Sequence, residues 1–152
     1  MLVLHATCVD IDGGAVLLRG PSAAGKSDLA LRLIDEGARL VADDQVQVTA
    51  VRGELIASAP SQLSGKMEVR GIGIVDLDAE RLSPRARVAL VADLGPSGDI
   101  ARMPYRTTCR LHDIDVPLIA IAPFEASAPA KIRMALAAWG NEGRQAQAQN
   151  DA

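Results

Sequence analysis

The segment of residues 20–27 constrains the fold more than any other part of the chain. It fits the pattern G-x-x-x-x-G-K-[ST] at every fixed position, between an apolar strand pattern and a helical pattern. In such a loop, backbone N–H groups and the positive end of the following helix hold phosphates, the lysine reaches their oxygens, and the hydroxyl binds Mg²⁺. The alternative is a glycine-rich turn with an exposed lysine. We expect a phosphate-binding loop made of Gly20, Pro21, Ser22, Ala23, Ala24, Gly25, Lys26 and Ser27.

The segments around this loop predict a hairpin followed by a strand–helix–strand unit. Residues 3–11 are rich in β-branched and aliphatic residues, residues 15–18 are aliphatic, and an Asp-Gly-Gly turn lies between the two runs, which indicates a hairpin. Apolar residues at helical spacing predict a helix over residues 26–36, and Gly37 suits its end. Residues 39–42 form a short apolar run that predicts a buried strand.

The rest of the chain completes an α/β domain with a mixed sheet and flanking helices. Helix propensity and an early proline predict a second helix over residues 129–139. We expect one domain over residues 1–139 and a frayed, polar tail over residues 140–152. Further strands are expected at residues 46–51, 71–77, 88–92 and 118–122, with loops at 81–87 and 94–106.

Composition excludes several classes of protein. The chain has 152 residues, of which 49% are hydrophobic and 2% aromatic, so it can build an aliphatic core. The net charge is -3, and the chain lacks the basic stripe expected of a protein that binds nucleic acid or anionic membranes. Cys8 and Cys109 form no disulfide framework, and Cys8 is expected to act as a small core hydrophobe. With no signal peptide or long apolar run, a cytoplasmic protein is expected.

Two adjacent carboxylates follow the strand of residues 39–42. The helix carries the chain about 15 Å from the phosphates, and the strand returns it by roughly 16–20 Å. Asp43 and Asp44 should therefore lie at the phosphate end of the sheet. Because neighbouring strand residues face opposite ways, one carboxylate could hold metal or water and the other could act as a base. A solvated Asp-Asp turn is the alternative.

Other polar residues allow two interpretations each. His5, in an apolar strand, is by ordinary burial trends a packed residue rather than a catalytic one. Glu68 and Arg70 fall on one face of an extended segment. Glu68 could bind a metal and Arg70 could clamp a phosphate, or the two could form an exposed ion pair. Gly71 and Gly73 are expected to permit close backbone approach.

Taken together, these motifs resemble the catalytic domain of bacterial HPr kinase/phosphorylase over residues 3–139. The shared features are a histidine before the phosphate loop, a V-A-D-D strand end and an E-[IV]-R-G-x-G signature. The resemblance implies the P-loop fold of that domain, which is PEP carboxykinase-like. It implies ATP and Mg²⁺ as cofactors, HPr as the substrate protein, and a hexameric homo-oligomer in the bacterial cytoplasm.

The resemblance also implies roles for individual residues. Lys26 would bind phosphates, Ser27 and Glu68 would hold Mg²⁺, and Asp44 would be the general base for the substrate serine, with His5 at the family's active-site histidine position. In the reverse direction, phosphate would attack phosphoserine and release pyrophosphate, with Asp44 as the proton donor. Such a set suffices in principle because phosphoryl transfer needs mainly positioning and charge neutralisation.

The sequence departs from the family pattern in three places. It starts directly at the kinase domain, as a short form would. The family's arginine in a D-R-L-G-like segment matches Arg102 best and Arg106 less well. The basic P-x-[RK]-P-G-R-N loop, tied to phosphorolysis, is replaced at residues 123–131 and lacks its arginines, so phosphate recognition should be weaker there unless Lys131 or Arg133 substitutes.

Two other functions fit the phosphate loop. A small-molecule kinase could use Arg81, Arg85 and Arg87 as a lid. A nucleotide sensor without catalysis would fit the altered loop at residues 123–131.

Overall fold

The computed structural model describes residues 1–141, so most of the predicted tail, residues 142–152, lies outside the described part. Within that part the helices are α1 (Lys26–Asp35) and α2 (Ala128–Trp139), with 3-10 turns at Ser61–Leu63, Ala79–Arg81 and Ser97–Asp99. No helix among these residues has the length and apolar character to cross a bilayer. The strands are β1 (Leu2–Leu4), β2 (Ala6–Ile11), β3 (Gly14–Arg19), β4 (Arg39–Ala42), β5 (Val46–Val51), β6 (Glu54–Ser58), β7 (Lys66–Val69), β8 (Gly73–Asp76), β9 (Arg85–Leu94), β10 (Thr107–Leu111) and β11 (Ile114–Ile121).

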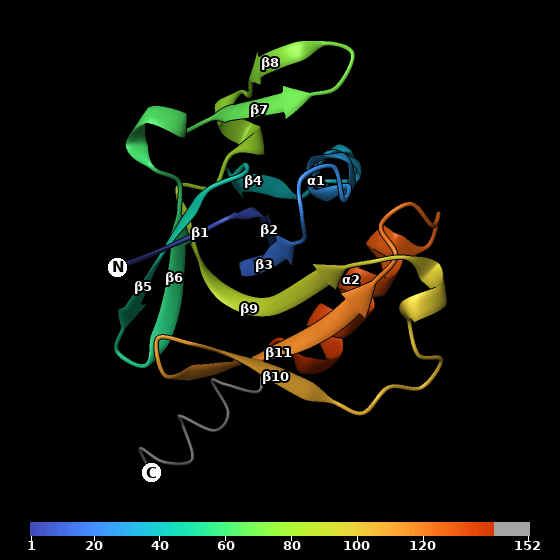
Figure 1. Cartoon of the computed structure of the whole chain (residues 1–152). Coiled ribbons are helices and arrows are strands. Elements are labelled where there is room, and N and C mark those ends of the chain that lie inside the picture. Colours follow the sequence, from blue (N-terminus) through green and yellow to red (C-terminus); the bar gives the residue numbers. More distant parts are fainter. Residues whose placement is uncertain (142–152) are drawn as a thin grey trace.

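The strands form one large mixed sheet and a separate hairpin. The large sheet has the order β1-β5-β6-β9-β3-β2-β4, and β11 pairs with both β9 and β10. Strands β3 and β11 run parallel to β9, whereas the other pairs are antiparallel. The separate hairpin is β7-β8, which stands apart from the curled main sheet in Figure 1. The predicted α/β fold with a mixed sheet is confirmed.

The first strand predicted from the sequence is two strands. The chain bends at His5, so that β1 pairs with β5 while β2 pairs with β3 and β4. The β2-β3 hairpin itself is as predicted, and the Asp10 carboxylate accepts a hydrogen bond of 2.8 Å from the Gly13 N–H in its turn. At this bend the His5 side chain is exposed rather than buried in the sheet.

Strand β9 is longer than its apolar pattern predicted. Residues 85–87, expected in a loop, pair with β6, with Arg87 opposite Ile56. The end of the same strand pairs with β11, with Val91 opposite Leu118. Along its other edge β9 pairs with β3. One strand therefore holds three parts of the sheet together.

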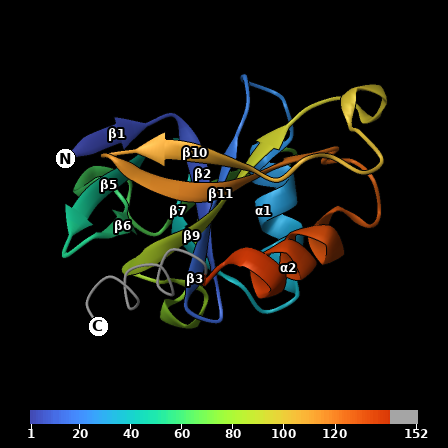
Figure 2. The same ribbon diagram turned by 90° about the horizontal axis from the view of Figure 1, so that it is seen from below.

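Two apolar layers lie on opposite faces of the sheet. Both helices pack on one face of the sheet (Figure 2). The apolar layer there includes Leu29 and Leu33 of α1, Ile132 of α2 and Leu18 of β3. Burial of each such side chain stabilises the fold by roughly 2 kcal/mol. On the other face the sheet curls back on itself (Figure 1), and a second cluster of buried apolar residues lies there. This second layer contains Ala6, Cys8, Leu17, Val46, Val48, Leu55, Ala57, Val91, Leu111 and Val116.

Candidate phosphate-binding and catalytic site

The loop of residues 20–27 joins the end of β3 to the start of α1, as the motif predicted. Gly25 has a φ of +102°, a conformation that side chains with a Cβ rarely adopt. A Cβ at Gly25 would also lie 2.8 Å from Cζ of Phe124, too close for an ordinary contact. The Gly25 carbonyl accepts the Leu29 N–H at 2.9 Å and starts the helix. Backbone geometry thus requires glycine at this position, and a Cβ there would also displace the exposed Phe124 ring.

Lys26 lies across its own loop. Its side chain is buried, and Nζ donates hydrogen bonds to the carbonyls of Gly20 at 2.6 Å and Pro21 at 3.0 Å. The ammonium is therefore fixed at the N-terminal end of α1, where the helix dipole already favours an anion. An exposed lysine on a simple turn, the alternative interpretation, does not describe this geometry.

Asp43 meets the phosphate loop at the end of β4. Strand β4 is antiparallel to β2, and β2 is antiparallel to β3, so β4 and β3 run in the same direction and end on the same side. Asp43 Oδ1 accepts a hydrogen bond of 2.8 Å from the Ser27 hydroxyl. Its Oδ2 accepts one of 3.1 Å from the backbone N–H of Glu68. The carboxylate returns to the phosphate end, as expected, and is held there by α1 and β7.

Thr7 is a polar residue of this site that the sequence analysis missed. Its side chain is completely buried, and its hydroxyl donates to Asp43 Oδ1 at 3.1 Å. The Thr7 hydroxyl oxygen also accepts a hydrogen bond of 3.3 Å from the backbone N–H of Asp44. The available signal was a lone hydroxyl within an apolar strand, two residues after His5.

Asp44 and His5 form an exposed pair beside the buried Asp43. Asp44 has a φ of +66°. Its carboxylate Oδ1 lies 3.4 Å from Nδ1 of His5, with side-chain exposures of 63% and 52%. The expectation of a packed histidine is therefore wrong. The two aspartates occupy different environments, so one can anchor the loop while the other meets a substrate.

Glu68 and Arg70 lie on the β7-β8 hairpin. The neighbours of Glu68, Met67 and Val69, pack into the helix-side core, whereas both charged side chains are exposed. Within residues 1–141 no ion pair joins Glu68 to Arg70, so that alternative is not observed. The hydrogen bond from the Glu68 backbone to Asp43 attaches the hairpin to the site.

Gly71 and Gly73 serve the turn of this hairpin by their backbone conformation. Their φ values are +88° and +117°. A Cβ at either position would meet nothing within 4 Å, so no other described segment of the chain approaches these glycines closely. The turn closes with a 3.0 Å hydrogen bond from Ile72 N–H to the Val69 carbonyl.

The oxygen donors of the site suit Mg²⁺. The Ser27 hydroxyl and the Asp43 carboxylate lie in contact, and the exposed Asp44 follows in the chain. Among residues 1–141 no group of three or more His, Cys, Asp or Glu side chains forms a ready metal cage. Mg²⁺ usually keeps several waters and binds through one or two carboxylates together with substrate phosphates. The residues present fit that mode of binding.

The segment of residues 123–131 packs against the phosphate loop. Arg32 of α1 donates hydrogen bonds to the carbonyls of Pro123 and Glu125, which hold Phe124 beside Gly25. The Glu125 carboxylate accepts hydrogen bonds from Lys131 at 2.9 Å and from Ser97 at 2.8 Å, and these bonds lower its pKa.

The two cations proposed to replace the arginines of this segment already have partners. Lys131 pairs with Glu125 at 2.9 Å, and Arg133 pairs with Glu36 of α1. Neither supports a direct substitution for the lost arginines.

The arginines predicted at the active site lie in different places. Arg102 is exposed in the loop between the 3-10 turn at Ser97–Asp99 and β10, with no hydrogen bond or ion pair to other described residues. Arg106 lies over the Trp139 ring, 4.8 Å from its centroid. A third arginine, Arg19, directly precedes the phosphate loop and binds the Asp93 carboxylate through two hydrogen bonds of 2.7 and 3.0 Å. These bonds raise the pKa of Arg19 and fix the end of β3 to β9.

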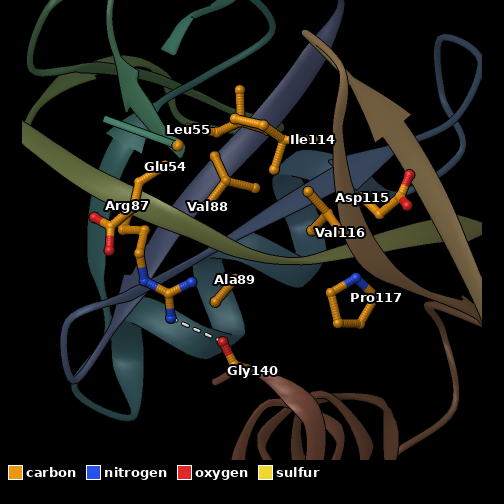
Figure 3. Close-up of a pocket in the computed structure, with 11 residues that line it drawn as sticks. Glu54, Leu55, Arg87, Val88, Ala89, Ile114, Asp115, Val116, Pro117 and Gly140 are labelled. Carbon is orange, nitrogen blue, oxygen red and sulfur yellow. Dashed lines mark hydrogen bonds between the residues drawn. The ribbon is translucent and has the colours of Figure 1, made fainter. Parts of the chain in front are cut away.

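One arginine of the supposed lid, Arg87, lies away from the loop. Arg87 lies opposite Gly14, at the start of β3, whereas the loop follows the end of that strand. A six-residue strand separates these ends by about 17 Å. Figure 3 shows Arg87 lining a small cavity between β9 and β11 and bonded to the Gly140 carbonyl, at 2.8 Å. Arg87 therefore does not lie over the phosphate loop as the lid of a small-molecule kinase would require.

Comparison with known proteins decides the family. The sequence model of the HPr Serine kinase C-terminal domain matches residues 1–129. The chain belongs to the HPr serine kinase C-terminal domain family. A solved structure of this family, the Hpr(Ser) kinase/phosphatase from Coxiella burnetii, superposes with a TM-score of 0.79 and 27% identity over 100% of both chains. The family fold is thereby confirmed.

Curated members of the HPr serine kinase family share the sequence as well. The HPr kinase/phosphorylase of Clostridium tetani is 50% identical over 74 residues, 49% of this chain and 24% of the relative. That of Exiguobacterium sp. is 35% identical over 131 residues, 80% of this chain and 42% of the relative. The chain thus matches less than half the length of these relatives.

Proposed function

We propose that this protein is a kinase that transfers the γ-phosphoryl group of ATP to a serine of the phosphocarrier protein HPr, with Mg²⁺. The observation that carries the proposal is the hydrogen bond from Ser27 to Asp43, because it unites the phosphate loop with the aspartate pair. Membership of the HPr serine kinase family supports the substrate. The relatives named HPr kinase/phosphorylase support the same reaction.

The phosphate side of the site consists of the loop and Lys26. Backbone N–H groups at the start of α1 and the buried ammonium would bind the ATP phosphates and offset the charge that spreads over the transferred group. Ser27 and Glu68 would hold Mg²⁺, with Asp43 fixing the Ser27 hydroxyl. When bound, Mg²⁺ would neutralise charge on the phosphate oxygens.

The acceptor side consists of Asp44 and His5. Asp44 would accept the proton of the substrate serine hydroxyl while that oxygen forms its bond to the γ-phosphorus and the bond to ADP breaks. The exposure of its carboxylate, 63%, leaves it accessible to a protein substrate. His5 would orient this carboxylate from 3.4 Å away. Arg102 would contribute positive charge from its exposed loop.

The reverse reaction would use the same residues. Inorganic phosphate would attack phosphoserine on HPr, Asp44 would return a proton to the leaving serine oxygen, and pyrophosphate would form. The acidic Glu125 occupies the segment that packs on the phosphate loop, so we expect phosphorolysis to be slower than the kinase reaction. A hexameric assembly in a bacterial cytoplasm belongs to the same proposal.

The test is intact-mass spectrometry of HPr from the source organism after incubation with the protein and Mg-ATP, with fragmentation to locate the phosphate. One phosphoserine per HPr is expected. Addition of excess inorganic phosphate should then remove it and release pyrophosphate slowly. Absence of modification, with ATP binding shown separately by calorimetry, would reject the HPr kinase and favour a small-molecule kinase or a nucleotide sensor.

A further inference from the structure

Thr7 joins the two aspartates of the site through a single oxygen atom. The hydroxyl donates its proton to Asp43 Oδ1 at 3.1 Å and accepts the N–H of Asp44 at 3.3 Å. Cys8 pairs with Ala42 across β2 and β4, so Thr7 lies directly beside the residues that follow β4. Its side chain has 0% exposure, so water cannot replace either bond without entering the core.

The backbone after β4 needs support at this point. Asp44 has a positive φ of 66°, which is unfavourable for a residue with a Cβ, and a hydrogen bond of 2.8 Å from Gln45 N–H to the Asp43 carbonyl closes a tight turn around it. Strained conformations persist only where surrounding contacts fix them. The Thr7 hydroxyl contributes such a contact, because it holds the Asp44 N–H inside the protein.

We propose that Thr7 is a positioning residue that fixes the carboxylate of Asp44 relative to the phosphate loop. It does so by coupling the main chain of Asp44 to the side chain of Asp43, which in turn holds Ser27. The inference rests on the proposed function, in which Asp44 receives the serine proton. Thr7 does not contact the reacting atoms, so it acts on the rate only through the aspartates.

Two substitutions separate the hydroxyl from the shape of the side chain. Thr7→Val keeps the volume and removes both hydrogen bonds, and Thr7→Ser keeps the hydroxyl. For Thr7→Val we expect kcat for HPr phosphorylation to fall about 10- to 100-fold, as for other residues that orient a catalytic ligand. The KM for ATP should stay unchanged because the loop is intact, and Thr7→Ser should restore kcat. Thr49→Val, on the exposed part of β5, is the matched control and should change neither constant.

A second measurement does not depend on activity. Hydrogen exchange of the Asp44 amide, followed by NMR, should be slow in the wild type and Thr7→Ser and fast in Thr7→Val. If Thr7→Val does not fold, Thr7→Ala takes its place in both measurements.

Three results would overturn the positioning role: wild-type kcat in folded Thr7→Val, a loss of kcat that Thr7→Ser does not restore, or equal Asp44 amide exchange in all variants. A wild type that leaves HPr unmodified would instead defeat the proposed function. In that case only amide exchange tests the hydrogen bond between Thr7 and Asp44. Loss of Asp44 amide protection in Thr7→Val alone would support that hydrogen bond.

Discussion

The hydroxyl of Ser27 and the carboxylate of Asp43 lie 2.8 Å apart and connect the first turn of α1 to the end of β4. The connection depends on sheet topology: β2 lies between β3 and β4 and is antiparallel to both, so the two flanking strands end on the same side.

Removal of the Lys26 side chain should abolish most turnover while the fold remains. Lys26→Ala deletes the ammonium that lies across the loop, and removal of one such charge-stabilising group typically lowers kcat about 10²- to 10³-fold. The rate of phosphoserine formation and the far-UV circular dichroism spectrum check this. Lys66→Ala, which removes an exposed lysine paired with Asp76, is the control and should be fully active. Wild-type turnover in Lys26→Ala would refute the phosphate-loop assignment.

Asp44→Asn should abolish phosphorylation of HPr and retain ATP binding. The change removes the proposed proton acceptor but keeps a side chain that tolerates the positive φ of this position. Turnover by mass spectrometry and ATP affinity by calorimetry separate the two effects. Asp113→Asn is a close control, because Asp113 has a φ of +60° and lies in the turn between β10 and β11. A parallel loss of ATP binding in Asp44→Asn would instead assign Asp44 to structure or metal binding.

Gly25→Ala should prevent ATP binding for two separable reasons. The new Cβ would clash with Phe124, and the positive φ would cost about 1–2 kcal/mol in its own right. Gly37→Ala carries the same kind of strain, at a φ of +112°, with nothing within 4 Å of its Cβ. We expect Gly37→Ala to lose stability and keep ATP affinity. In calorimetry, the double variant Gly25→Ala/Phe124→Ala should regain only part of the affinity, and full recovery would show that strain is unimportant.

Because of Cys8, the stability of the fold should decrease at alkaline pH. Burial, with a smaller contribution from the charge of Asp10, raises the pKa of the Cys8 thiol far above its ordinary value of 9.0. In the unfolded chain the thiol ionises above that pH, whereas in the folded chain it stays protonated. Stability is therefore retained below pH 9.0 and falls as pH rises above it, by at most about 1.4 kcal/mol per pH unit.

Urea unfolding of the wild type and Cys8→Ala under reducing conditions measures this effect. The alanine variant should be less stable at pH 7, and the difference should shrink by pH 10. A difference that does not change with pH would show that the thiol ionises equally in both states.

The local parts of the site were predictable because short patterns determine them. Helix α1, strand β4 and the loop between β3 and α1 match their predicted positions, since apolar spacing and glycine placement act over a few residues. The return of Asp43 to the phosphate end followed from element lengths alone. Its contact with Ser27 confirms that estimate.

Other parts of the fold depend on pairing between distant segments. Strand β6 was not predicted, and Arg85 and Arg87 resembled a loop, although each pairs across the β6-β9 ladder. Strand β10 is mostly exposed and therefore has no clear apolar alternation. Thr7 was missed because its partners lie 36 and 37 residues away in sequence. Such residues acquire a role only after the sheet brings the segments together.

The pairing of β3 with β9 also determines when the phosphate loop can form during synthesis. Arg19, the residue before the loop, is bonded to Asp93, 74 residues later in the chain. As the chain leaves the ribosome, the complete glycine motif emerges well before the strand that supports it. Long-range pairing of this kind is slow to form. The nascent protein therefore carries the proposed phosphate-binding motif without the strand that fixes Arg19 until translation has passed β9.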